Sequence, residues 1–480
     1  MSGNDFLALS PLVLLAGSSV LIMLLIALKL SHRNIQVCSL LLFIASFSSI
    51  FYTWKLFPYN IEPLLLIDDF SGFIIGLIIF SSLVVNILSY IYFEEKEESP
   101  KEYYVLLFLC ALGACVLAVS KHFISFFLGL EILTVGLYAL IAYLRARHYN
   151  IEAGVKYLIL AAFSSAFLLF GMALIYLQTG SMEFSAIARS LNSLRSLPPL
   201  FLTGLGMMLI GAGFKLAVVP FHMWTADVYQ GAPIPVTAFI ATVSKGGVLA
   251  VLLRFFITID VFRFKTVILV LIGIAIASMI IGNLLALQQR NVKRILAYSS
   301  IAHLGYLLVA FIPGTVMSIR AISFYLVAYF LTTLTAFGVM TILSSKERDA
   351  EEIDDYKGLF WQQPVLACIF TASLLSLAGI PLTAGFVGKF FILAAGLQAG
   401  FWAIAFVLIL SSVVGLYYYL RIITMMFTAK KTSTLPIEKR AHPAFYVMSV
   451  IVLSVLTVLI IWFGVYPSGL MSFAGYFRIK

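Results

Sequence analysis

The chain has 480 residues, of which 62% are hydrophobic and 11% are charged, and its mean hydropathy is +1.07. A soluble domain is about half apolar and about a quarter charged, so this composition excludes a water-soluble globule and the disordered, collagen-like and disulfide-stapled classes. The net charge of +10 is not gathered into a basic domain outside the bilayer. We therefore expect it to set membrane topology rather than to bind nucleic acid.

Fourteen apolar segments are long enough to span a bilayer as helices. They are continuously apolar rather than alternating, which excludes an outer-membrane β-barrel. In chain order they are Leu9–Leu30, Ile35–Trp54, Gly72–Phe93, Tyr103–Ser120, Phe123–Leu144, Val155–Tyr176, Phe201–Val219, Pro235–Phe256, Val267–Leu287, Leu296–Phe311, Ala321–Leu343, Val365–Leu393, Phe401–Phe427 and Tyr446–Val465. Ser185–Ser196 is expected to be a surface stretch. The sequence predicts an all-α polytopic membrane protein of about 14 transmembrane helices.

Basic residues are distributed unequally between the two sides of this bundle. The loops after the odd-numbered segments, with their flanks, carry 18 Lys and Arg residues, and the opposite loops carry 10. Cytoplasmic loops are enriched in Lys and Arg. An even number of spans places both chain ends on one side, and the bias predicts that this side is outside the cytoplasm.

The sequence shows no site for a nucleotide, metal or redox group. It has no glycine-rich phosphate loop, and its longest polar connections, Glu94–Glu102, Lys346–Lys357 and Lys430–Pro443, are too short to fold alone. The four cysteines lie in apolar runs without metal-ligand spacing. Energy for any transport is therefore expected to come from an ion gradient or from a partner.

Five ionisable residues stand out deep inside the predicted spans, where a charge costs about 2.5–3.5 kcal/mol on insertion scales. They are Glu131, Lys215, Lys245, His303 and Lys389. Such residues face protein or water and are functional candidates. Glu131 is the only acid deep in any span, and Lys215 on the seventh segment is its obvious partner. The pair is either functional or a static ion pair that fixes helix packing.

Lys245 and Lys389 have no acid near them in the sequence. Desolvation destabilises the charged form of a buried lysine, which can then load and release a proton near physiological pH. A proton relay requires such groups, whereas the alternative for each lysine is snorkelling from a position near a helix end. His303 suits proton transfer, or it is a hydrogen-bonded core histidine.

Three further polar residues lie nearer the ends of the spans. Lys156 follows Glu152 by four residues, which allows an ordinary intrahelical ion pair, and it is a weaker candidate for the relay. His222 and Asp227 follow the seventh segment. They line an entrance to the relay or simply belong to a solvated loop.

Two of the predicted helices contain breaks. Pro220 follows Lys215 by five residues, and Gly379-Ile380-Pro381 precedes Lys389 by eight. Discontinuous helices at membrane depth are tolerated where they line a cavity, and breaks in corresponding places of two halves indicate repeated bundles. Helices 4–8 and 9–13 would be two five-helix units in which helices 7 and 12 correspond.

Several ordered motifs together resemble the antiporter-like subunit family of respiratory complex I (NADH–quinone oxidoreductase), and most of all its bacterial N subunits, which correspond to mitochondrial subunit 2. The likeness runs from about residue 70 to about residue 430. It rests on Gly213–Lys215, Val219–Trp224, Asp227–Val236, Asn291–Arg294, Tyr298–Tyr306, Leu377–Pro381 and Gly388–Lys389.

The resemblance implies two inverted five-helix repeats, at 103–258 and 259–430, between N-terminal helices at 1–102 and a C-terminal helix at 431–480. It also implies Glu131 and Lys215 as an ion pair, Lys245 as the central relay lysine and Lys389 as the distal lysine. Other family members often carry a histidine where this chain has Ala241. This departure, with the N-subunit-like Asp227–Tyr229, argues for complex I and against a sodium/proton antiporter.

The resemblance further implies a proton-translocating subunit in a bacterial inner membrane, with both chain ends on the periplasmic side. It implies no cofactor in this chain, and NADH, FMN, iron–sulfur clusters and quinone in partner subunits. The expected partners are neighbouring antiporter-like subunits, small multi-helix subunits and membrane lipids. The alternatives are a multisubunit sodium/proton antiporter, a related redox-driven pump that does not use NADH, and a structural membrane scaffold.

Overall fold

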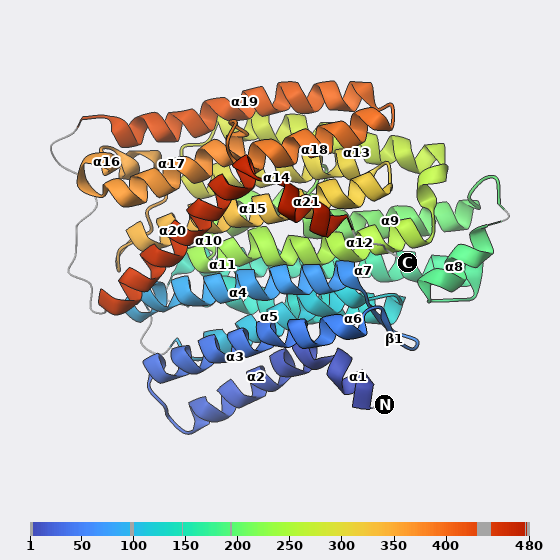
Figure 1. Ribbon diagram of the computed structural model, residues 1–480, viewed down its shortest axis with the longest axis horizontal. Coiled ribbons are helices and arrows are strands. Elements are labelled where there is room, and N and C mark those ends of the chain that lie inside the picture. The colour runs from blue at the N-terminus through green and yellow to red at the C-terminus, as the bar shows by residue number, and fades with distance from the viewer. Residues whose placement is uncertain are drawn as a thin grey trace.

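The computed structural model describes residues 3–96, 100–145, 147–192, 194–429, 443–475 and 477, which form a bundle of helices lying side by side (Figure 1). Parts of the connections Glu94–Glu102 and Lys430–Pro443 lie outside the described residues. So do six of the basic residues behind the topology prediction, namely Lys430, Lys431, Lys439, Arg440, Arg478 and Lys480.

The described residues contain 13 helical spans that are long and apolar enough to cross a membrane. They and one broken span account for all fourteen expected segments. The spans are α2 (Ser10–Ala27), α3 (His32–Thr53), α4 (Asp69–Lys96), α5 (Glu102–Val119), α6 (Phe123–Ile141), α7 (His148–Thr179), α9 (Pro199–Leu216), α11 (Ile234–Phe239) with α12 (Lys245–Thr258), α13 (Lys265–Leu287), α14 (Val292–Phe311), α15 (Val316–Leu343), α17 (Pro364–Ala378) with α18 (Ala384–Gln398), α19 (Trp402–Phe427) and α20 (Pro443–Val465).

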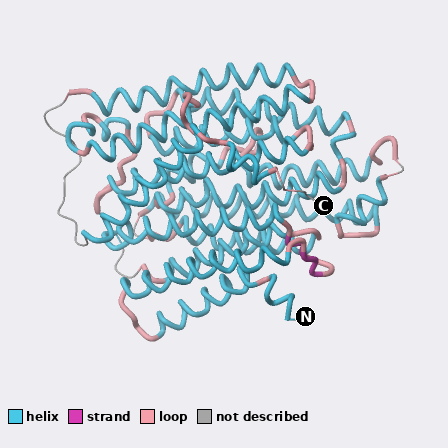
Figure 2. Tube along the Cα trace, viewed as in Figure 1, coloured by secondary structure: helices cyan, strands magenta, loops and turns pink. Residues whose placement is uncertain are grey.

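Short elements lie between the spans. They are α1 (Gly3–Ala8), α8 (Phe184–Leu191), α10 (Trp224–Gly231), α16 (Leu359–Gln362) and α21 (Ser468–Ala474), the 3-10 turns Trp54–Leu56, Val261–Arg263 and Ile353–Tyr356, and a hairpin of β1 (Tyr59–Ile61) and β2 (Leu65–Ile67). The hairpin pairs Tyr59 with Ile67 (Figure 2). The expected surface stretch Ser185–Ser196 contains most of α8, whose apolar side chains Phe184, Ile187 and Leu191 are buried.

Helix ends differ from the expected ones where polar residues continue a helix beyond its apolar run. The sixth span begins at His148, seven residues before Val155, because its first turns carry polar residues such as Asn150 and Glu152. The seventh span ends at Leu216 instead of Val219, because Ala217 adopts a left-handed conformation with φ 61°.

The two predicted breaks are present and share one hydrogen-bond pattern. After α9, the amide of Val218 donates to the carbonyl of Gly213 at 3.0 Å. After α17, Gly379 has φ +85°, and the amide of Ile380 donates to the carbonyl of Leu375 at 3.0 Å. Both are helix ends with a left-handed residue, which satisfy part of the terminal carbonyls and let the chain turn. The fold is therefore the predicted polytopic bundle with broken helices 7 and 12.

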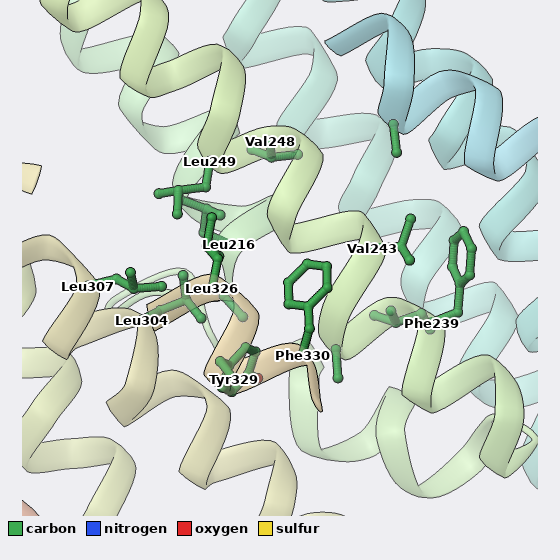
Figure 3. Close-up of a cluster of buried hydrophobic side chains, with 14 of the residues drawn as sticks. Leu216, Phe239, Val243, Val248, Leu249, Leu304, Leu307, Leu326, Tyr329 and Phe330 are labelled. Carbon is green, nitrogen blue, oxygen red and sulfur yellow. The ribbon is translucent and has the colours of Figure 1, made fainter. Parts of the chain in front are cut away.

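The core lies along the middle of the bundle. In the α11–α12 and α15 spans every residue of the most apolar stretch is buried, whereas in α2, α7 and α20 a third or fewer of the residues in that stretch are buried. Figure 3 shows apolar side chains from α9, α11–α12, α14 and α15 meeting in one cluster, among them Leu216, Val248, Leu304 and Phe330. This packing surrounds the part of the chain that carries Lys245.

Both chain ends lie on the same side of the bundle (Figure 1). Asp5 of α1 accepts a hydrogen bond of 2.6 Å from Tyr59 in the hairpin. At the other end of the chain, Phe477 packs against Phe70 and Phe73 at the start of α4. The even number of spans explains this arrangement, and the assignment of that side to the periplasm stays a prediction.

Candidate functional site

Lys215 lies one residue before the end of α9 and is 3% exposed. Its Nζ donates to Oγ1 of Thr134 on α6 at 2.7 Å and lies 5.3 Å from the centre of the Tyr157 ring on α7. A lysine at this depth therefore has a neutral hydroxyl and an aromatic face as partners.

Glu131 lies on α6, one turn before Thr134, and is half-buried. It accepts a hydrogen bond of 2.6 Å from Oγ of Ser165 on α7. In the described part of the chain, no contact of ion-pair length joins Glu131 to Lys215, although the two are close enough to interact electrostatically. The direct ion pair expected from the sequence is open in this structure.

Lys245 begins α12, directly after a π-helical segment at Ile240–Ser244, and is 2% exposed. Its Nζ donates to Oγ of Ser300 on α14 at 2.7 Å. Gly246, the next residue, lets the Phe330 ring pack against α12, because a Cβ at this position would come within 2.5 Å of that ring. Lys245 is thus held inside the bundle, in a place that offers no route for snorkelling.

One face of α14 connects the surroundings of Lys245 to those of Lys389. Ser300, His303 and Tyr306 are spaced by three residues and therefore lie on one side of the helix. His303 is buried, with Nδ1 2.6 Å from the hydroxyl of Tyr325 and Nε2 3.3 Å from that of Tyr419. The histidine is hydrogen-bonded on both nitrogens and lies between the two lysines' partners on this helix.

Lys389 of α18 reaches back to the break after α17. Its Nζ donates to the carbonyls of Leu377 at 2.8 Å and Ala378 at 2.9 Å, and to Oγ of Ser412 at 2.9 Å. It also lies 5.1 Å from the centre of the Tyr306 ring. The break therefore supplies the carbonyl oxygens that hold this lysine, because a continuous helix would have used them internally.

Lys156 lies apart from these residues at an exposed end of the bundle. It is 45% exposed, with Nζ 2.7 Å from Glu152 and 3.3 Å from Asp227, which also binds Arg294 at 2.7 Å. Burial disfavours the ionised form of Asp227, but the hydrogen bonds from Arg294 and Lys156 outweigh it and lower its pKa. His222 is buried in the break after α9.

A buried ion pair that the sequence did not reveal joins two distant elements. Arg254 near the end of α12 binds Asp68 with two hydrogen bonds of 2.8 Å each, and their side chains are 1% and 5% exposed. Both residues lie at the margins of apolar runs, where charged residues are ordinary. Only the buried ion pair between them, which joins residues 186 positions apart, distinguishes them from other charged residues at span ends.

Asp349 is the centre of a second missed cluster. It lies 2.7 Å from Lys96, 3.1 Å from Lys293 and 3.5 Å from Arg147, and accepts a further hydrogen bond from Tyr92. Burial disfavours the ionised carboxylate, but the neighbouring lysines and arginine hold the pKa of Asp349 well below its usual value. Its charged neighbours come from three other segments, so no local pattern distinguished it in a loop rich in charges.

A polar cavity of about 620 Å³ lies beside this cluster. Lys156, Asp227, Lys293 and Asp349 are among its lining residues. Among the described residues, no group of three or more His, Cys, Asp or Glu side chains is arranged to hold a metal ion.

Two comparisons with known sequences agree on the family that this chain resembles. A family model described as "NADH:quinone oxidoreductase/Mrp antiporter, TM" matches residues 120–415. The NADH-quinone oxidoreductase subunit N of Nitrosospira multiformis is 46% identical over 484 residues, which cover 98% of this chain and 95% of that relative.

Solved structures of membrane complexes have the same fold. A chain of respiratory complex I from Thermus thermophilus, solved with bound aureothin, is 32% identical with a TM-score of 0.81, covering 96% of this chain and 98% of that one. A chain of the Mrp complex from Dietzia sp. DQ12-45-1b has a TM-score of 0.87 at 21% identity, covering 99% and 97%. A chain of an archaeal membrane-bound sulfane sulfur reductase has a TM-score of 0.82 at 25% identity, covering 98% and 96%.

Proposed function

Because this chain belongs to the NADH:quinone oxidoreductase/Mrp antiporter family of transmembrane subunits, we propose that it moves protons through a relay of Glu131, Lys215, Lys245 and Lys389. The relay is coupled to quinone reduction in partner subunits of a complex I. Those partners would hold NADH, FMN, the iron–sulfur clusters and quinone, and this chain would supply the proton path.

The observation that carries the proposal is the set of hydrogen-bond partners of the three buried lysines. Each has neutral oxygen partners: Thr134 for Lys215, Ser300 for Lys245, and Ser412 with two backbone carbonyls for Lys389. A lysine locked to a carboxylate would keep its proton, whereas one held by neutral groups in a low-dielectric interior is poised to lose it. A purely structural bundle has no use for such groups, because burying unpaired charge destabilises it.

The face of α14 supports a connection between Lys245 and Lys389, because it carries a hydrogen-bond partner of Lys245 and a ring that lies against Lys389. Ser300 and Tyr306 are six residues apart, which is about 9 Å along a helix. His303 lies between them, hydrogen-bonded to Tyr325 and Tyr419. No hydrogen bond joins Lys215 to Lys245 among the described residues, so we propose that side-chain rotation or water completes that step.

The energies are compatible with one pumping step per switching event. Moving one charge against about 150 mV costs about 3.5 kcal/mol. A change of two to three pK units in a proton-binding group corresponds to about 3–4 kcal/mol. Opening and closing of the Glu131–Lys215 pair, driven by charge movement in the quinone-reducing subunits, would supply a change of this size.

The test replaces Lys245 by Met in the assembled complex and measures NADH-driven proton uptake in inverted membrane vesicles. We expect pumping and coupled NADH–quinone turnover to fall together, and Lys245→Arg to fail as well because arginine does not deprotonate. Lys265→Met is the matched control, since this lysine is exposed at the start of α13. Normal pumping by Lys245→Arg would contradict the relay, and sodium-dependent transport without NADH would favour an antiporter.

A further inference from the structure

Each charge of the Glu131–Lys215 pair is held by a hydroxyl group instead of by the other charge. Lys215 Nζ donates to Thr134 Oγ1 at 2.7 Å, and Ser165 Oγ donates to Glu131 Oε1 at 2.6 Å. Thr134 and Ser165 are themselves 4% and 8% exposed. These hydroxyls are therefore parts of the buried site rather than of a solvated surface.

The two hydroxyl groups have opposite hydrogen-bonding roles: Thr134 accepts from Lys215, and Ser165 donates to Glu131. Thr134 donates its own hydrogen to the carbonyl of Leu130 at 2.6 Å, so its oxygen is left to accept from the ammonium of Lys215. Ser165 directs its hydrogen at Glu131, as a carboxylate requires, because an ionised carboxylate only accepts. Thr134 thus substitutes for the anion in front of Lys215, and Ser165 substitutes for the cation in front of Glu131.

The backbone around the pair is closely packed. A Cβ on Gly171 of α7 would come within 2.5 Å of the carbonyl of Gly204 on α9, and Ser164 donates to the carbonyl of Gly211 at 2.8 Å. Because α7 and α9 meet at such short range, the pair changes partners most easily by side-chain rotation. Glu131 and Thr134 lie one turn apart on the same face of α6, within the range of one lysine side chain.

We propose that Thr134 and Ser165 are positioning residues that hold the Glu131–Lys215 pair open, each as a neutral substitute for the opposite charge. The inference rests on the proposed function. In the closed state, Lys215 moves one turn along α6 from Thr134 to Glu131, and both hydroxyls lose their charged partners. The rings of Tyr157 and Phe214, 5.3 and 5.6 Å from Nζ, stabilise the ammonium in the open state.

The test compares Thr134→Val, which keeps the shape and removes the acceptor, with Thr134→Ser, which keeps the hydroxyl. In inverted vesicles holding the whole complex, we expect Thr134→Val to lower NADH-driven pumping roughly tenfold, the effect of losing a hydrogen bond to a charged group. Thr134→Ser should pump like the parent. Native electrophoresis checks that each variant assembles, and Ser165→Ala removes the other hydroxyl should Thr134→Val not assemble.

A spectroscopic measurement separates positioning from packing. Infrared difference spectra of the complex, with the Glu131 carboxylate band identified by its loss in Glu131→Gln, should show that band shifted in Thr134→Val and Ser165→Ala but not in Thr134→Ser. An unshifted band with parental pumping in both hydroxyl-free variants would overturn the inference. Lys215→Met distinguishes the two failures: if it pumps normally the relay itself is wrong, and if it alone fails only the positioning roles are wrong.

Discussion

At the scale of single residues, this protein contains two kinds of buried charge. Lys215, Lys245 and Lys389 have neutral oxygen partners, whereas Arg254 and Lys293 have carboxylate partners within 3.1 Å. The first kind is suited to changing its protonation state, and the second kind is suited to keeping it. The partner of a buried charge, and not its depth, therefore separates the proposed relay from the supports of the fold.

Asp349, the carboxylate partner of buried lysines of the second kind, gives a prediction about stability. Replacing it by Asn keeps its shape but leaves Lys96 without its carboxylate partner and Lys293 with only the more distant Glu351 at 3.9 Å, although both lysine side chains are 2% exposed. We expect a loss of about 3–5 kcal/mol, the usual cost of breaking a buried ion pair on one side. Thermal unfolding of the purified complex in detergent would measure it, with the exposed Glu347→Gln as the control.

The pH dependence of this effect has a definite sign. The folded-state pKa of Asp349 lies below the ordinary 3.8, so its contribution is fully present above that ordinary value and is lost as pH falls through the folded-state pKa. The difference between the parent and Asp349→Asn should therefore be constant from about pH 6 to pH 8. A difference that disappears on mild acidification within that range would contradict the assignment.

At the scale of elements, the two breaks have different relations to their lysines. Lys215 precedes its break and points away to α6, whereas Lys389 follows its break and binds the carbonyls that the break exposes. Gly379 permits the second arrangement, because its φ of +85° suits glycine, and a Cβ there would lie 3.0 Å from Cδ of Lys389. The turn and the lysine are thus packed as one unit.

Gly379→Ala tests this unit against a matched control. Gly400 has a similar φ of +82°, but a Cβ added there would meet no other atom within 4 Å. Gly400→Ala therefore carries the same backbone strain, about 1–2 kcal/mol, without touching Lys389. We expect both variants to lose similar stability and only Gly379→Ala to lose pumping. Equal pumping by the two variants at equal expression would show that the contact with Lys389 is unimportant.

The sequence predicted elements better than it predicted contacts. Continuous apolar runs identify spans because a bilayer leaves the backbone no alternative to internal hydrogen bonds. Gly379-Ile380-Pro381 identifies a break because glycine permits a left-handed turn and proline has no amide hydrogen to continue the helix. The hydroxyl partners Thr134 and Ser165 and the pairing of Asp68 with Arg254 depend on helices that meet only in the fold. Serine and threonine are also common in spans, so they gave no signal of their own.

At the scale of the whole molecule, the chain is a bundle with a buried centre and apolar flanks. Exposed apolar side chains cover α7, α19 and α20, including Phe163, Phe406 and Trp462, and lipid or partner subunits would cover them in a membrane. Both chain ends lie on one side (Figure 1). The distribution of basic residues predicts that this side is periplasmic.

Sidedness can be measured with two engineered cysteines in a variant whose own exposed thiol is removed by Cys368→Ser. Glu347→Cys lies in the loop after α15, and Lys265→Cys lies at the opposite end of the bundle, at the start of α13; both native side chains are exposed. A membrane-impermeant thiol reagent added to intact spheroplasts should label the second and spare the first. The reverse pattern would place the chain ends in the cytoplasm.

The face of α14 described above has a consequence for how this protein tolerates change. Ser300, His303 and Tyr306 follow one another at three-residue spacing along a single helix, so their alignment depends on the turn of that helix. One residue inserted between Ser300 and His303 would leave α14 apolar and helical, yet it would turn Ser300 by about 100° relative to His303 and Tyr306. The proposed proton path therefore depends on helical register: a substitution changes one position, whereas a single insertion displaces every position on one side of it.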